Sequence, residues 1–384
     1  MFVTKLKAIL FVLALGVVSL LLMTTTSTRA QKQQQQTRTT LRWEETDDGL
    51  RMRVDIEGKP EFTDDYTDVR DVSEGGYVRI EEDRNGQSRR YEVRRAGGEL
   101  QRFYYLNGAA HPLDQEARNW IAKIVLNAVR QSGIDADKRV LRILKQHGVS
   151  GVLDEIGLVS GSYAKRIYFQ SFVKNGNLNT AQLQNVLREA ARQISSDYEQ
   201  AQLLIGVAPV LISNQAALPA FFEATQTISS DYEHKRVLTA LLKDNTPSHE
   251  VLIQTAKSAA HMSSDYEKAS VLKAVAGVYL DDRDLANAFF QTVNTISSDY
   301  EHRGVLSALL KNSKLNTDVL SRVLNSAGSM SSDYEKATLL IEASNTYAGD
   351  TRLREGFLQA AQTIKSDYER GRVLSALMKN KQIS

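Results

Sequence analysis

The chain has 384 residues, with 48 Lys and Arg against 46 Asp and Glu, and it contains no cysteine. Without cysteine it can hold no disulfide, thiol nucleophile, cysteine-ligated zinc or iron–sulfur cluster. The formal net charge of +2 argues against a nucleic-acid-binding protein, because such proteins usually carry a concentrated basic excess.

The first thirty residues have the composition of an export signal. Lys5 and Lys7 precede an apolar run over residues 8–23, and a polar stretch then ends at Ala30. A basic start, an apolar centre and a small-residue end are typical of a secretory signal, here cleaved after Ala30. The alternative is an uncleaved anchor, although the run is shorter than the about 20 residues of a membrane-spanning helix. Both interpretations predict an exported chain, either periplasmic or secreted, or anchored and facing outside the cytoplasm.

Alternating apolar and polar residues predict an antiparallel β module after a solvated linker. The alternation is clearest at Leu50–Ile56, and Tyr77–Glu81 and Arg89–Val93 flank Asn85-Gly86, a strong hairpin signal. Leu100–Leu106 completes a predicted sheet of four strands. We expect one face to be lined by Val78, Ile80, Tyr91 and Val93. Apolar residues at helical spacing over Asp114–Gln131 predict a helix that covers the other face of the sheet.

Two polar clusters in this module invite a ligand interpretation. Glu61–Asp68 contains three aspartates, but it lacks the regular spacing of a calcium loop, so we interpret it as a turn with solvated carboxylates. Five arginines suggest an anionic ligand, yet acidic residues alternate with them, and we therefore favour cross-strand ion pairs. These arginines are Arg79, Arg89, Arg90, Arg94 and Arg95.

The strongest pattern is a six-residue motif that returns every 34 residues. Its copies are Ile194–Glu199, Ile228–Glu233, Met262–Glu267, Ile296–Glu301, Met330–Glu335 and Ile364–Glu369. Such strict spacing predicts a stacked array of repeats. His or Arg follows three copies and Lys follows two, which leaves a 68-residue pair as an alternative unit. A second helix in each unit, as at Leu285–Val293, predicts an α-solenoid, with degenerate copies at Ser160–Ile167 and Ile134–Leu141.

Each motif predicts the start of a helix. Ser196 and Glu199 stand three apart before an apolar-periodic segment, which is typical of a capping box in which serine and glutamate bind each other's backbone amides. Asp197 lies in the first turn, where the helix dipole favours negative charge. The predicted capping residues are Ser196, Asp197, Tyr198, Glu199, Ser230, Asp231, Tyr232, Glu233, Ser264, Asp265, Tyr266, Glu267, Ser298, Asp299, Tyr300, Glu301, Ser332, Asp333, Tyr334, Glu335, Ser366, Asp367, Tyr368 and Glu369.

The two modules together resemble a known kind of sequence. Phe62–Asp65, Gly75–Tyr77 and the Ser-Asp-Tyr-Glu motifs resemble exported bacterial proteins, and are similar to the extracytoplasmic tails of membrane zinc metallopeptidases of the beta-lactam-sensor type. That family's multi-spanning domain and His-Glu-x-x-His are absent, so no peptidase role is carried over. The repeat architecture also resembles tetratricopeptide and HEAT-like solenoids, without the tetratricopeptide residue pattern.

Catalytic motifs are absent from the sequence. His249-Glu250 begins a zinc-binding pattern, but Ile253 occupies its closing position. Ser162 and Lys165 match Ser-x-x-Lys of penicillin-recognising enzymes without the partner motifs, and helix capping explains them better. The repeated Asp-Tyr-Glu could be a ladder of acid–base groups or metal ligands, but we interpret it as repeated copies of one structural solution.

The predicted fold is therefore α+β overall, a small antiparallel β module followed by an all-α solenoid. The predicted segments are 1–30 (signal peptide), 31–40 (linker), 41–112 (β module), 113–193 (helices with degenerate repeats) and 194–384 (solenoid). We expect a non-enzymatic scaffold that binds a protein or peptide, without cofactor, metal or nucleic acid. The alternative is a sensory or regulatory ectodomain that the uncleaved N-terminal segment tethers to the membrane.

Basic residues after the motifs are the predicted contacts with the partner. The histidines at 234 and 302 occupy equivalent sites two repeats apart, either on a common binding surface or as solvated first-turn residues. The candidate partner-binding residues are His234, Arg236, His302, Arg303 and Arg370.

Overall fold

The computed structural model describes residues 40–47, 50–243, 247–278, 282–312, 315–345 and 351–379. The predicted signal peptide and nearly all of the linker lie outside these residues, so their prediction stays untested. Among the described residues, no helix is both long and apolar enough to cross a membrane. The chain divides into two compact units, Met1–Asp135 and Ala136–Ser384.

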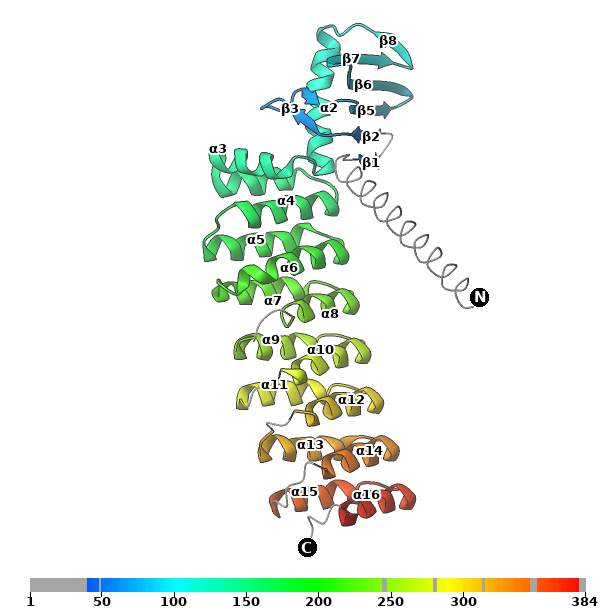
Figure 1. Ribbon diagram of the computed structural model, residues 1–384, viewed down its shortest axis with the longest axis vertical. Helices are drawn as coiled ribbons and strands as arrows, with labels where there is room; N and C mark the ends of the chain where they lie inside the picture. Colours follow the sequence, from blue (N-terminus) through cyan, green and yellow to red (C-terminus); the bar gives the residue numbers. More distant parts are fainter. Residues whose placement is uncertain are drawn as a thin grey trace, which may run out of the picture. The chain divides into compact units, whose positions relative to one another are not determined.

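The first unit contains a six-stranded antiparallel sheet in the order β1-β2-β5-β6-β7-β8 (Figure 1). The strands are β1 (Thr40–Asp47), β2 (Leu50–Glu57), β5 (Tyr77–Arg84), β6 (Gln87–Ala96), β7 (Glu99–Leu106) and β8 (Ala109–His111), with a separate pair β3 (Pro60–Phe62) and β4 (Val69–Val72). The four predicted strands are confirmed as β2, β5, β6 and β7. The predicted total of four is wrong because β1 and β8 add a strand at each edge.

Local backbone geometry explains the hairpins. Asn85 and Gly86 both have positive φ angles, 50° and 82°, as the two-residue turn between β5 and β6 requires. Asn107 and Gly108 repeat this pattern, at 49° and 82°, and so bring the short β8 back onto β7. This second Asn-Gly turn is the physical reason for strand β8, one of the two edge strands that the prediction missed.

Helix α2 (Gln115–Ser132) covers one face of the sheet, as predicted. Asp114 caps its first turn by accepting from the Ala117 amide, and Gly133 ends it with a φ of 71°. Its buried face shares one core with the inner face of the sheet, and the predicted residues of that face are all at most 1% exposed, namely Val78, Ile80, Tyr91 and Val93. The predicted cover and core residues are confirmed, but the prediction that they lie on opposite faces of the sheet is wrong. Helix α2 packs on the same face as Val78, Ile80, Tyr91 and Val93, because the alternate positions on the other face are charged, such as Arg79 and Glu92.

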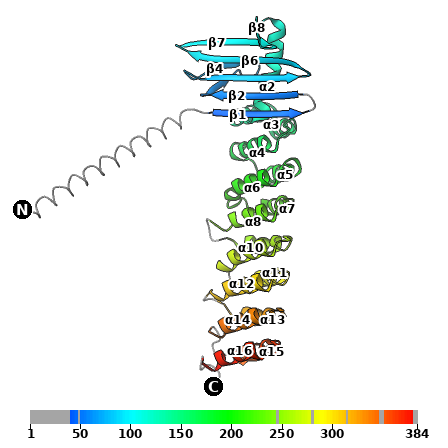
Figure 2. The same cartoon turned by 90° about the vertical axis from the view of Figure 1, so that its right-hand side faces the viewer.

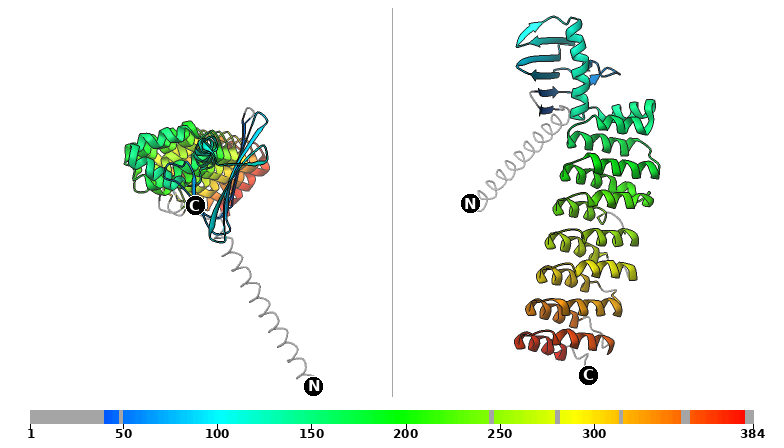
Figure 3. Two further views of the ribbon diagram at one scale, coloured as in Figure 1. Left: turned by 90° about the horizontal axis from the view of Figure 1, so that it is seen from above. Right: turned by 180° about the vertical axis from the view of Figure 1, so that it is seen from behind.

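The second unit is the predicted stack of paired helices. Its helices are α3 (Ala136–Gly157), α4 (Ser162–Asn175), α5 (Thr180–Gln193), α6 (Asp197–Leu211), α7 (Leu218–Gln226), α8 (Asp231–Ala240), α9 (His249–Ala259), α10 (Asp265–Gly277), α11 (Arg283–Val293), α12 (Asp299–Leu310), α13 (Thr317–Ser329), α14 (Asp333–Ser344), α15 (Thr351–Gln362) and α16 (Asp367–Lys379). Gly148, with a φ of 67°, breaks α3 into two helical pieces. The helices form layers (Figure 3).

The helices of each layer fall into two rows (Figure 2). We call α4, α6, α8, α10, α12, α14 and α16 the motif row, because six of them begin with the Ser-Asp-Tyr-Glu motif, and α5, α7, α9, α11, α13 and α15 the opposite row. Within the motif row each helix packs directly against the next. Between the rows, fully buried residues such as Leu272 and Phe289 fill the core. The two predicted helices per repeat are confirmed.

Candidate functional site

The serine of each motif begins a helix, as predicted. Ser264 accepts a hydrogen bond from the Glu267 amide at 3.3 Å, and the same bond recurs in every copy. The other half of the predicted capping box is wrong, because the Ser264 amide donates to Asp231 of the preceding motif at 2.6 Å. The serine backbone amide, which a capping box would bind to the motif glutamate, is thus bound by an aspartate of the neighbouring repeat.

The aspartate of each of the first five motifs connects one repeat to the next. Asp265 Oδ2 accepts from the Ser297 amide at 3.0 Å and the Ser298 amide at 2.8 Å. Asp231, Asp299 and Asp333 accept from the equivalent amides, and Asp197 accepts from one of them. Two amides of one repeat are therefore bound by a carboxylate from the repeat before it. We call this contact the aspartate clamp.

The glutamate of each motif forms an ion pair with a basic side chain. Lys235 binds Glu267 at 2.6 Å and Lys273 binds Glu301 at 2.8 Å, in each case from the preceding motif-row helix. The pairs Arg166–Glu199 and Arg303–Glu335 connect neighbouring helices in the same way, whereas Arg236–Glu233 and Arg372–Glu369 form within one helix. All six motif glutamates thus have a cationic partner.

In the first five motifs the residue after the glutamate is buried, which corrects the prediction for two histidines. His234 and His302 are only 3% and 4% exposed, so they are neither solvated nor available to a partner. Their Nε2 atoms lie 2.9 Å from Ser258 Oγ and 2.8 Å from Ser326 Oγ. Burial lowers the pKa of His234 to about 4 and also lowers the pKa of His302, because desolvation disfavours the charged ring.

Lysine or glutamine takes the place of histidine in three other repeats and binds backbone carbonyl groups instead of a serine hydroxyl. Lys268 and Lys336 donate to the carbonyl oxygens of Thr295 and Thr363 at 3.2 Å and 3.1 Å, just beyond the ends of α11 and α15. Gln200 donates to the Ala224 carbonyl at 2.8 Å. The lysine and glutamine donors satisfy carbonyl groups at the end of the following helix, where cations are also favoured. The alternation in the sequence therefore reflects two ways to bind one helix terminus.

The tyrosine of each motif projects its aromatic ring into solvent. The side chains are 51–74% exposed in the six motifs, and Tyr163, which takes the same place at the second residue of α4, is 47% exposed. Within the described part of the chain, every exposed tyrosine belongs to this set. We call the set the tyrosine ladder: Tyr163, Tyr198, Tyr232, Tyr266, Tyr300, Tyr334 and Tyr368.

Cationic side chains lie beside most rings of the ladder. Lys235 Nζ is 4.6 Å from the centroid of Tyr232 and 5.9 Å from that of Tyr266. Arg303 lies 5.4 Å from the Tyr300 centroid, and similar contacts join Arg166 to Tyr163, Arg236 to Tyr198 and Arg372 to Tyr334. Most of these cations also bind the motif glutamate of the next repeat. They therefore connect the tyrosine ring of one repeat to the first turn of the next motif-row helix.

The three predicted partner-binding arginines have different surroundings. Arg236 and Arg303 lie beside rings of the tyrosine ladder and so form part of that surface, but the charge of each is paired with a carboxylate. The Arg370 side chain is 40% exposed and binds Asp367 of its own helix. Sequence reasoning missed the tyrosines as a surface, because the motif was explained by capping alone; an aromatic residue repeated at a first-turn position was the available signal.

A cavity of about 380 Å³ is lined in part by Arg236, which also lies beside the ladder ring of Tyr198. Apolar side chains make up most of its wall, and Arg236 and Lys243 contribute the charged groups. The apolar part is formed largely by Ile205, Pro209, Ile212, Leu218 and Val251. Since Ile212 is 57% exposed, this site could accept an apolar side chain of a partner.

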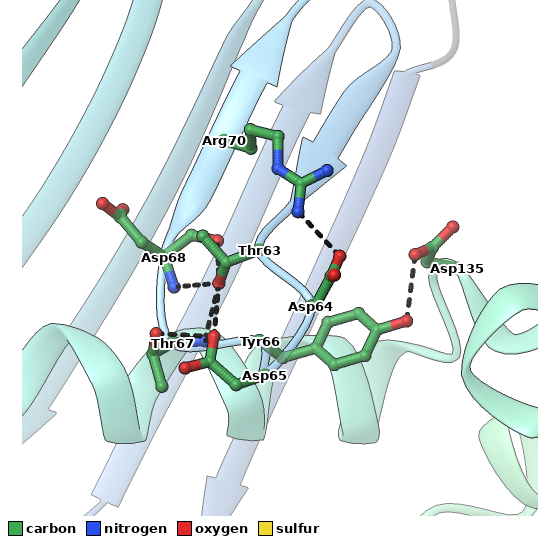
Figure 4. Close-up of polar contacts among 8 residues, drawn as sticks. All are labelled: Thr63, Asp64, Asp65, Tyr66, Thr67, Asp68, Arg70 and Asp135. Atoms are coloured by element: carbon green, nitrogen blue, oxygen red, sulfur yellow. Dashed lines mark hydrogen bonds and ion pairs between the residues drawn. The ribbon is translucent and has the colours of Figure 1, made fainter. Parts of the chain in front are cut away.

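The aspartate-rich loop of the first unit is closed by its own hydrogen bonds (Figure 4). Asp65 Oδ1 accepts from both Thr67 donors, at 3.1 Å and 2.7 Å, and from the Thr63 hydroxyl at 2.8 Å. These bonds lower the pKa of Asp65 to about 2. Asp64 binds Arg70 at 2.7 Å. The carboxylates here serve turn geometry and ion pairing, in agreement with the interpretation as a turn.

The remaining ligand candidates also have structural partners. Arg79 of β5 binds Glu92 of β6, which is fully buried, and Arg90 of β6 binds Glu81 of β5, so the preference for cross-strand ion pairs is confirmed; Arg94 binds Glu92 within its own strand. The Ser162 hydroxyl accepts from the Ser195 and Ser196 amides, in the place of an aspartate clamp, while Lys165 donates to the Gln193 carbonyl. Among the described residues, no group of three or more acidic or histidine side chains could hold a metal ion.

Comparison of the chain with protein-family models, with curated proteins and with solved structures found no match.

Proposed function

We propose that the protein is a non-enzymatic interaction scaffold that holds a segment of a partner protein along the tyrosine ladder. The exposed ring in every motif carries this proposal. Serine, aspartate and glutamate of the motif bind within or between repeats, whereas the tyrosine ring is left largely in solvent. Tyrosine is enriched at protein interfaces because its ring offers a large contact area at a small conformational cost.

The area of the ladder matches the needs of a protein interface. A tyrosine side chain offers roughly 200 Å², and an exposure of 47–74% leaves roughly 100–150 Å² of each ring accessible. The seven rings together therefore present roughly 700–1,000 Å², and each partner in a standard interface buries about 800 Å². The ladder alone could supply one side of such an interface.

The place of action is a separate proposal that rests on the sequence of the leader. Its basic start, apolar centre and small-residue end support export from the cytoplasm. The similarity to extracytoplasmic tails of beta-lactam-sensor-type metallopeptidases is consistent with work at the cell envelope. We therefore expect the partner to be an envelope or extracellular protein.

The function is tested by capture of partners with matched variants. The triple variant Tyr232→Ser/Tyr266→Ser/Tyr300→Ser removes three neighbouring rings. Its control, Gln291→Ser/Asn325→Ser/Gln359→Ser, changes three exposed side chains at equivalent positions of the opposite row. Each protein is immobilised and exposed to an envelope extract of the source organism. We expect a protein retained by the wild type and the control to be lost from the tyrosine variant.

A structural role of the rings predicts a different result. If the tyrosines serve only as partners of the neighbouring cations, the tyrosine variant loses stability but retains the same proteins as the control. Urea unfolding of all three proteins separates the cases, because exposed cation–ring contacts contribute only about 0.5–1 kcal/mol each. Equal retention by the tyrosine variant and the control would overturn the proposed function.

A further inference from the structure

The spacing of the ladder restricts the conformation of a bound segment. Successive motif-row helices pack directly against each other, for example α10 against α12, and packed helix axes lie about 8–10 Å apart. Each helix carries one ladder ring at the second residue of its first turn. A partner that contacts every ring must therefore present a similar side chain on the same face about every 8–10 Å.

Among regular peptide conformations, the polyproline-II helix meets this condition. It has three residues per turn and rises about 3.1 Å per residue, so every third side chain returns to one face after about 9.3 Å. A β-strand covers a similar distance in three residues, but its side chains alternate, and every third one lies on the opposite face. An α-helix returns to nearly the same face after seven residues, or about 10.5 Å, and loses register over several rings.

The charges around the ladder favour an uncharged segment. Each motif glutamate already has a cationic partner, and the clamp aspartates accept backbone amides. A strongly acidic or basic peptide would have to compete with these contacts. A polyproline-II segment instead offers free carbonyl groups, which tyrosine hydroxyls can bind, and proline-rich segments dock on aromatic-lined surfaces.

We propose that the tyrosine ladder binds a proline-rich segment of the partner in the polyproline-II conformation, with one three-residue turn on each repeat. This inference rests on the proposed function, since it names the kind of segment held by the same surface. Seven rings correspond to about 21 residues of such a segment. Affinity should therefore increase with each added triplet up to about this length.

Synthetic peptides on the full-length protein test the inference. The probes are fluorescent (Pro-Pro-Ala) peptides of 6, 12, 18 and 24 residues, and the control is an 18-residue (Gly-Ser-Ala) peptide without polyproline-II preference. We expect the 18-residue proline peptide to bind at least tenfold more tightly than the control. We also expect the gain in affinity to level off between 18 and 24 residues, and Tyr232→Ser/Tyr266→Ser/Tyr300→Ser to weaken binding at least tenfold.

Several results would overturn the inference. Equal binding of proline and control peptides, or binding that the tyrosine variant leaves unchanged, would exclude it. Tyrosine-dependent binding of chitohexaose, a neutral oligosaccharide, in place of the proline peptides would assign the ladder to a glycan. If a captured partner depends on the tyrosines while the proline peptides do not bind, the proposed function stands and this inference fails. If no ligand depends on the tyrosines, both fail.

Discussion

Replacement of one clamp aspartate measures how strongly neighbouring repeats are coupled. Asp265→Ala removes the carboxylate that accepts from the Ser297 and Ser298 amides at 3.0 Å and 2.8 Å. Hydrogen bonds to charged groups contribute about 1.5–3 kcal/mol each in buried settings. The Asp265 side chain is 23% exposed and Ser297 is exposed, so water can replace part of this interaction. We expect the variant to lose about 2–3 kcal/mol for the two bonds together.

The chain offers a matched control for this experiment. Asp367 begins α16 in the same first-turn position, but it is 89% exposed and its carboxylate binds Arg370 of its own helix. Asp367→Ala carries the same changes in helix propensity and dipole interaction, so it should cost less than about 1 kcal/mol. The difference between the losses of stability in Asp265→Ala and Asp367→Ala therefore gives the contribution of the aspartate clamp.

Urea unfolding and amide exchange detect the loss. A cost of about 2–3 kcal/mol corresponds to roughly 30- to 150-fold faster exchange of the amides at residues 297 and 298, if they exchange through opening of this interface. Equal losses in the free energy of unfolding for Asp265→Ala and Asp367→Ala would refute the clamp. The aspartate would then stabilise the helix only through the helix dipole, as the sequence alone suggested.

Two further predictions concern buried titratable side chains. The pKa of His234 lies near 4 in the folded chain and near 6.5 when unfolded, so the unfolded state binds more protons between these values, and stability falls as pH decreases through this window. Urea unfolding at a series of pH values should show that His234 makes the protein about 2 kcal/mol less stable at pH 5 than at pH 7.5. His234→Gln, which copies Gln200 of an earlier repeat, should reduce this loss of stability. An unchanged dependence of stability on pH in the variant would contradict the prediction. Burial alone would raise the pKa of Glu92, but hydrogen bonds from Arg94 and Arg79 lower it. Glu92→Gln should therefore reduce the free energy of unfolding in urea by about 1–2 kcal/mol, while Glu99→Gln at an exposed position should change it very little. Equal losses for the two variants would exclude the arginine cluster as a source of stability.

The repeat could be predicted because spacing and caps are local properties. A 34-residue period and the serine of each motif were sufficient to place the motif-row helices, and Ser264 caps α10 as expected. Alternation likewise identified β2, β5, β6 and β7. Strand β8 has only three residues, so its signal was carried by Asn107-Gly108 rather than by any pattern of its own.

The contacts between repeats could not be read from the same pattern. Asp265 is equally compatible with a dipole interaction and with a clamp, because the sequence does not say which backbone groups lie opposite its carboxylate. His234 follows a solvent-exposed turn in sequence, yet its side chain points to the end of the next helix. Serine at 258 and 326, each 24 residues after a histidine, was the signal that could have shown this pairing.

The tyrosine ladder as a binding surface is the central claim, and site-specific photo-crosslinking tests it most directly. A photoreactive phenylalanine analogue replaces Tyr232, Tyr266 or Tyr300 in turn, and replaces Gln291 or Asn325 of the opposite row as controls, in cells that express the full chain. We predict crosslinks to one common protein from the three tyrosine positions and none from the two controls. Crosslinks from the control positions alone, or none from the tyrosine positions, would contradict the account.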